Sequence, residues 1–148
     1  MKQKRTRDEI INDVSFVLGL DLHHGTKLSV LDGAVWEWTV MDGKLDGCKF
    51  WTREALAVKN DKPKLTHEHA VPRKVLHAKF FSLSRPSPEV IGGIFRRFCV
   101  GVVVTRDQDK ILDQHGLRSS MPPGWGWDDP WARYRVAGIF EDVVEPKK

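Results

Sequence analysis

Three adjacent residues form the densest group of side chains that can transfer protons or bind a metal ion: His67, Glu68 and His69, followed at once by Ala70-Val71-Pro72. On a β-strand, His67 and His69 would share one face and Glu68 would point to the other, so the two imidazoles could chelate one ion. A histidine can also act as a base near neutral pH if another group orients its second ring nitrogen. The helical zinc signature H-E-x-x-H does not occur in the chain.

The segment from Glu68 to Pro72 resembles the opening of the HNH, or ββα-metal, nuclease motif, in which an acidic residue and a histidine precede a hydrophobic pair and a proline. In that family the motif strand pairs with a second strand, and a helix follows. Here Val100 to Val104 is typical of a buried strand, and Thr105 to Gln108 has the spacing of a capping box that opens a helix through Leu112. The resemblance covers residues 65–112. The stretch between the two strands would hold two inserted helices, and the Gly-rich turn and C-x-x-C pairs usual in the family are absent.

This resemblance implies a metal-dependent nuclease that hydrolyses phosphodiester bonds of DNA or RNA. It makes His69 the general base and Glu68 a metal ligand. The divalent ion, Mg²⁺ or Mn²⁺ with Zn²⁺ as an alternative, would stabilise charge on the phosphate. The family's third position, an Asn or His on the helix, has no direct counterpart here. The remaining candidates are Asp107 and Asp109 as oxygen ligands, with His67 and His115 in supporting positions around the ion.

The excess of basic charge is concentrated at the N-terminus. The chain has 24 Lys and Arg residues against 20 Asp and Glu residues, and four basic residues precede the first acidic one. A nucleic-acid surface must therefore be local, and we expect the N-terminal arm to be mobile and able to reach a phosphate backbone. The predicted nucleic-acid contacts are the basic residues of this arm and two that follow the motif: Lys2, Lys4, Arg5, Arg7, Arg73 and Lys74.

A Pro/Gly-framed loop with three tryptophans, Trp125, Trp127 and Trp131, supports a second interpretation. Exposed tryptophans in such a frame suit protein contact or base stacking, whereas buried ones would cover the core, and the sequence leaves both readings open. The alternative function is a non-enzymatic module that binds nucleic acid or a protein partner. A role in phage–bacterium conflict would suit the small size of the chain.

The hydrophobic pattern and capping signals predict an α+β fold that is mostly helical, with a small two-stranded β-hairpin and a ββα-metal-like core carrying helical insertions. We expect one domain of 148 residues, with a helical part up to residue 60 that includes the basic arm and a ββα-like part over 61–148 that includes the Trp-rich loop. The expected helices are 7–19, 30–41, a short one after Thr52, 73–83, 88–98, 107–112 and 129–138, with loops at 22–28 and 113–128.

The cysteine content and the hydropathy of the chain exclude several other classes. Cys48 and Cys99 form no C-x-x-C pair, which excludes a disulfide scaffold and a cysteine-rich zinc cage, and makes the reducing cytoplasm the expected location. No apolar run approaches the roughly 20 residues that a membrane helix needs, so we expect no membrane association.

Overall fold

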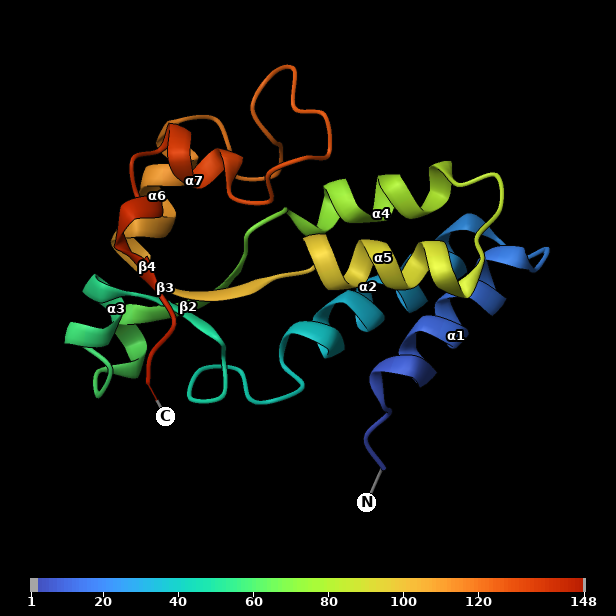
Figure 1. Ribbon diagram of the computed structural model, residues 1–148, viewed down its shortest axis with the longest axis horizontal. Helices are drawn as coiled ribbons and strands as arrows, with labels where there is room; N and C mark the ends of the chain where they lie inside the picture. The colour runs from blue at the N-terminus through green and yellow to red at the C-terminus, as the bar shows by residue number, and fades with distance from the viewer. Residues whose placement is uncertain (1–2, 148) are drawn as a thin grey trace.

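The computed structural model describes residues 3–147 and has an α+β architecture (Figure 1). Its elements, in chain order, are α1 (Arg7–Gly19), α2 (His24–Thr39), β1 (Phe50–Thr52), α3 (Arg53–Ala57), a 3₁₀ turn (Lys62–Lys64), β2 (Leu65–His69), α4 (Arg73–Ser82), α5 (Pro88–Phe98), β3 (Gly101–Thr105), α6 (Arg106–Gln114), α7 (Ala132–Val136), a second 3₁₀ turn (Phe140–Asp142) and β4 (Val143–Val144). No helix within the described residues is long and apolar enough to cross a membrane.

Four helices, α1, α2, α4 and α5, pack together on one side of the molecule, and the sheet with the three shorter helices lies on the other (Figure 1). Their shared core contains fully buried aliphatic and aromatic residues, including Ile10, Val35, Ile91 and Phe95. The predicted capping box at the start of α1 is present: Thr6 accepts from the backbone of Glu9, and Glu9 accepts from the backbone of Thr6. The sequence signals at this end therefore predicted the helix where it occurs.

The sheet has four strands in the order β2-β3-β1-β4, so the predicted two-stranded hairpin is wrong in number. Strand β1 runs parallel to β3, and β4 pairs antiparallel with β1. Because β1 has three residues and β4 has two, neither is long enough to show an alternating pattern. Strand β1 also lies within residues 1–60, the part expected to be helical, and joins that part to the central sheet.

The pairing on which the motif depends was predicted correctly. Strands β2 and β3 are antiparallel, with Glu68 opposite Val102 and His69 opposite Gly101. Helices α4 and α5 lie between these strands in sequence, as two inserted helices, and α6 follows β3 directly. Thr105 opens α6 with the expected capping box to Gln108. Strand β2 is at the edge of the sheet, with only β3 beside it.

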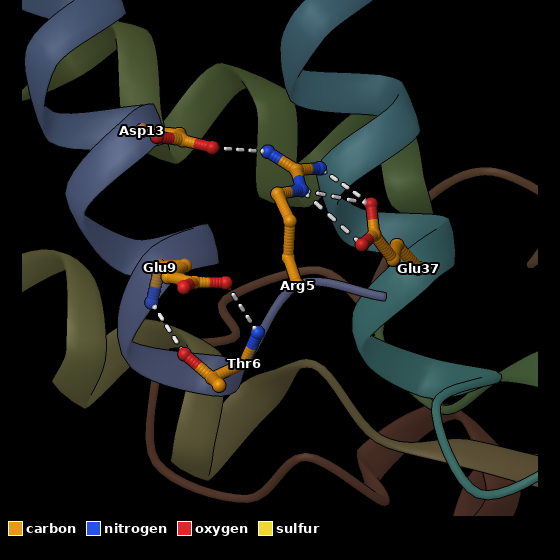
Figure 2. Close-up of polar contacts among 5 residues, drawn as sticks. All are labelled: Arg5, Thr6, Glu9, Asp13 and Glu37. Carbon is orange, nitrogen blue, oxygen red and sulfur yellow. Dashed lines mark hydrogen bonds and ion pairs between the residues drawn. The ribbon is translucent and has the colours of Figure 1, made fainter. Parts of the chain in front are cut away.

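The N-terminal arm is fixed to the helical layer from Arg5 onward, which corrects the expectation of a mobile arm (Figure 2). The guanidinium group of Arg5 donates to Asp13 of α1 at 2.6 Å and, through Nε, to both carboxylate oxygens of Glu37 of α2 at 3.2 Å. Arg7 belongs to α1, and its guanidinium carbon lies 4.6 Å from the ring centre of Trp38. Lys2 is outside the described residues, and Lys4 is exposed.

The Trp-rich loop folds back on the protein. The rings of Trp125 and Trp127 stand edge-on to Phe98, at centroid distances of 5.9 and 5.1 Å, and Trp131 packs near Phe50 and Tyr134. All three indoles are partly buried. These side chains extend two hydrophobic clusters of the core, so the core-covering alternative describes their contacts in this structure.

Candidate active site

A cavity of about 450 Å³ opens beside β2, at the free edge of the sheet. Strand β2 contributes its last four residues, and the beginning of α4 contributes Arg73, Lys74 and His77. Asp32 of α2, Asp109 of α6 and the segment around Arg118 complete the wall. Because alternate residues of a strand point to opposite faces, an edge strand can present both its faces to one opening. The cavity therefore collects imidazole, carboxyl and basic groups from five separate segments.

His69 is buried, with 6% of its surface exposed, and its ring is held from behind by α2. Its Nε2 lies 3.0 Å from the hydroxyl oxygen of Thr39, which itself donates to the carbonyl of Trp36 at 3.0 Å. With the hydroxyl proton on that carbonyl, the oxygen of Thr39 is left as an acceptor, and we assign the tautomer in which Nε2–H of His69 donates to it. Among the described residues Nδ1 has no hydrogen-bond partner, yet it is not one of the enclosed unpartnered atoms. We therefore assign Nδ1 as the nitrogen that His69 presents to the cavity.

Burial lowers the pKa of His69 to about 3, with further lowering by His67 and Arg73. The imidazole is consequently neutral at physiological pH, and its Nδ1 carries a lone pair. A bound anion would raise this pKa, because a nearby negative charge favours the imidazolium form. The ring therefore has the protonation state of a base before a substrate arrives.

His67 supports this arrangement from the same face of β2. Its Nδ1 lies 2.7 Å from the carbonyl oxygen of Lys44 and donates to it, while its Nε2 is buried without a partner. Burial lowers the pKa of His67, so the ring stays neutral. A Cβ at Gly101 would lie only 2.9 Å from Nε2 of His67, so the glycine on β3 leaves the space that this ring occupies.

Glu68 points to the opposite face of β2, where both of its carboxylate oxygens are engaged. One oxygen accepts from the guanidinium of Arg133 and the other from the hydroxyl of Tyr134. Arg133 is fully buried and also donates to the carbonyls of His69, of Ala70 at 2.9 Å and of Leu117 at 2.7 Å. Burial raises the pKa of Glu68, and the charge of Arg133 opposes that rise. This cluster fixes the backbone at the end of β2.

The residues expected to bind a metal ion do not assemble into a ligand set. Glu68 has no free oxygen, and Asp107 is exposed in the first turn of α6, where it lines a different hollow with Arg106 and Lys110. Asp109 does line the histidine cavity, whereas His115 is exposed and its Nδ1 is bonded to the carbonyl of Ile111. Within residues 3–147, no three His, Cys, Asp or Glu residues are grouped closely enough to hold an ion. The geometry of the donors thus does not fit the centre that the resemblance implies.

The sequence did not indicate a role for the third histidine of this cavity, His77 of α4. Its buried Nε2 lies 3.3 Å from Oδ1 of Asp32, at an angle that does not complete a hydrogen bond. Asp32 also lies 3.3 Å from the guanidinium of Arg73. Burial lowers the pKa of His77, and the charge of Asp32 opposes that change. The spacing of Arg73 and His77, one helical turn apart just after the motif, was the available signal, and no sequence pattern pointed to Asp32.

Two of the predicted nucleic-acid contacts, Arg73 and Lys74, are exposed at the mouth of this cavity, and Arg118 joins them. Arg5 and Lys4 do not line it, and Arg7 lines a separate hollow with Arg96. Three cations beside three imidazoles form a site suited to a phosphate group. No protein-family model, curated protein or solved structure matches the chain, so its function has to be inferred from this geometry.

Proposed function

We propose that this chain is a nuclease that cleaves phosphodiester bonds in the cavity beside β2, with Nδ1 of His69 as the general base. One observation carries the proposal: Nε2 of His69 lies 3.0 Å from the hydroxyl of Thr39, and Nδ1 has no hydrogen-bond partner among the described residues, in a ring that lines a cavity together with Arg73 and Lys74. An oriented neutral imidazole beside cations supplies two requirements of phosphodiester cleavage. It accepts a proton from the attacking hydroxyl group, and the cations stabilise the charge that develops on the phosphate.

The low pKa of His69 is compatible with this role. Burial is the main reason that the ring is neutral, and Arg73, which adds to this effect, would also attract a phosphodiester; bound phosphate raises the basicity of Nδ1. Glu68 and Arg133 act at a distance from the reaction, because they hold the backbone from which His69 projects. The alternative of a purely binding protein has less support, since Arg5 and the tryptophans of the loop make their contacts within the chain.

The direct test is cleavage of end-labelled DNA and RNA oligonucleotides by the purified chain, in separate reactions with Mg²⁺, Mn²⁺, Zn²⁺ or a chelator. Loss of a general base typically costs about 10² to 10⁴ in rate, so His69→Ala should slow cleavage at least a hundredfold. His24→Ala, at an exposed histidine outside the cavity, is the matched control and should cleave like the wild type. Absence of cleavage of either nucleic acid under every condition would reject the proposal.

A second pair of variants separates orientation of His69 from the integrity of the fold. Thr39→Val removes the oxygen that holds Nε2–H, while Thr39→Ser keeps it. We expect the valine variant to lose activity and the serine variant to retain most of it. If the two are equally active, Thr39 does not position the base.

A further inference from the structure

We propose that the substrate is RNA and that the attacking nucleophile is the 2′-hydroxyl group of the RNA itself, with His69 as base and His77 as acid. This inference rests on the proposed nuclease function and specifies its substrate class. It would make the reaction a transesterification that needs no external water in its first step.

The donor groups of the cavity argue against a mechanism in which a metal ion activates a water molecule. Both oxygens of Glu68 are occupied by Arg133 and Tyr134, and no three candidate ligands are grouped within the described part of the chain. Without such an ion, attack by water on a phosphodiester is slow. An internal 2′-hydroxyl next to the phosphorus has a large advantage in effective concentration, and only RNA carries one.

Two imidazoles are available for the two proton transfers. In each ring Nε2 lies beside a polar group of α2: the hydroxyl of Thr39 for His69, and the carboxylate of Asp32, at 3.3 Å, for His77. A carboxylate behind an imidazole stabilises its protonated form, whereas a hydroxyl that accepts from Nε2–H fixes a neutral tautomer. Burial lowers the pKa of both rings, but only for His77 does a carboxylate oppose the lowering, so His77 is better suited than His69 to carry the proton that is donated. His69 is the ring suited to accept one.

The step balances with these groups alone. Nδ1 of His69 takes the proton of the 2′-hydroxyl, and the 2′-oxygen forms a bond to phosphorus. The bond from phosphorus to the 5′-oxygen of the next nucleotide breaks, and that oxygen leaves with a proton from His77. The products are a strand ending in a 2′,3′-cyclic phosphate and a strand with a free 5′-hydroxyl, and Arg73, Lys74 and Arg118 face the charged phosphate throughout.

The experiment compares three oligonucleotides of one sequence in the presence of a chelator: all RNA, RNA with a single 2′-deoxy nucleotide at the cleaved position, and all DNA. We expect cleavage of the RNA with cyclic phosphate ends, and no cleavage at the deoxy position or in DNA. Cleavage of RNA and DNA alike, dependence on added metal ions, or 3′-hydroxyl products would overturn the inference and leave the nuclease proposal standing. Failure to cleave any substrate with or without metal ions would remove both.

The role of His77 is tested with a substrate whose leaving 5′-oxygen is replaced by sulfur, because a thiolate leaves without a proton. His77→Ala should slow cleavage of ordinary RNA at least a hundredfold. The same variant should cleave the sulfur substrate at nearly the wild-type rate. His69→Ala should be slow on both substrates. If His77→Ala is equally impaired on the two substrates, or unimpaired on ordinary RNA, His77 is not the acid and the inference fails.

Discussion

Arg133 is a charged side chain with no exposed surface, and its position explains why the carboxylate of Glu68 is bonded on the face of β2 opposite to the histidines. Its guanidinium binds Glu68 and three backbone carbonyls, so its charge is compensated and each of its three nitrogens donates at least one hydrogen bond. A buried charge without such partners would be costly, and a buried ion pair that loses one partner leaves the other uncompensated.

We therefore predict that Arg133→Met lowers the free energy of unfolding by about 3 to 5 kcal/mol, measured by urea denaturation. Arg135→Met is the matched control, because Arg135 forms an ion pair with Asp129 at 2.6 Å but is half exposed. An exposed pair contributes at most about 1 kcal/mol. Equal losses of unfolding free energy for the two variants would show that the buried contacts of Arg133 stabilise the fold no more than an exposed ion pair does.

The histidines of β2 give stability a predictable dependence on pH. The pKa of His69 falls from an ordinary value of 6.5 to about 3 on folding, and burial also lowers that of His67. The unfolded chain then binds more protons than the folded one between these values, so the stabilisation is complete above pH 6.5 and is lost as the pH falls. From about pH 7.5 to about pH 5, His69 alone should cost about 2 kcal/mol. His69→Gln should lose less stability over that interval than the wild type in the same urea titrations, and an unchanged loss would contradict the assignment.

At the scale of elements, the sequence predicted what local signals encode. The two capping boxes, the Ser87-Pro88 helix start and the β-branched run of β3 each determine structure within a few residues, and all were found. The start of α2 was missed because His23, an unusual cap, accepts from the backbone of Gly25 and extends the helix into the expected loop. Strands β1 and β4 were missed because they depend on pairing with distant residues, such as Phe50 with Val102.

In the candidate site, too, the local features were predicted from the sequence and the long-range contacts were not. The motif predicted a strand with His69 at its end, and that strand lines the cavity. The partner of Glu68 is Arg133, 65 positions along the chain, and the group behind His77 comes from α2. Neither contact leaves a pattern in the neighbouring sequence, so the sequence could not predict that the carboxylate of Glu68 is bonded within the protein.

Gln108 forms side-chain hydrogen bonds to three other segments of the chain, and its removal should destabilise the contacts among all of them. Its side-chain oxygen accepts from the hydroxyl of Thr52 at 2.6 Å and from the backbone of Thr105, and its nitrogen donates to Asp142 at 2.9 Å. Removing a buried side chain with several hydrogen bonds costs about 2 kcal/mol or more. We predict such a loss for Gln108→Ala in urea denaturation, against almost none for the exposed Gln114→Ala at the end of the same helix. A loss below about 0.5 kcal/mol for Gln108→Ala would mean that these contacts do not hold the elements together.

At the scale of the whole molecule, the net charge of +4 does not identify the face that we propose binds phosphate. Part of the excess is compensated in place, since Arg5 lies between Asp13 and Glu37. The exposed cations that line the cavity, beside its imidazoles, are Arg73, Lys74 and Arg118. An RNA strand should therefore be held mainly at the edge of the sheet, and the arm should contribute mainly to stability.

Arg5→Gln and Lys74→Gln separate these two roles with the same change of charge. Binding of single-stranded RNA is measured as a function of salt concentration in an inactive His69→Ala background. Lys74→Gln should weaken binding and reduce the slope of log affinity against log salt by about 0.7, the value for one phosphate contact on a single strand. Its stability should not change, because Lys74 is exposed and forms no ion pair among the described residues.

Arg5→Gln should leave the slope unchanged and lower the free energy of unfolding by up to about 1 kcal/mol, since its pairs with Asp13 and Glu37 are only partly buried. The reverse pattern, with Arg5→Gln reducing the slope and Lys74→Gln leaving it intact, would place the nucleic-acid surface at the N-terminal arm and not at the cavity.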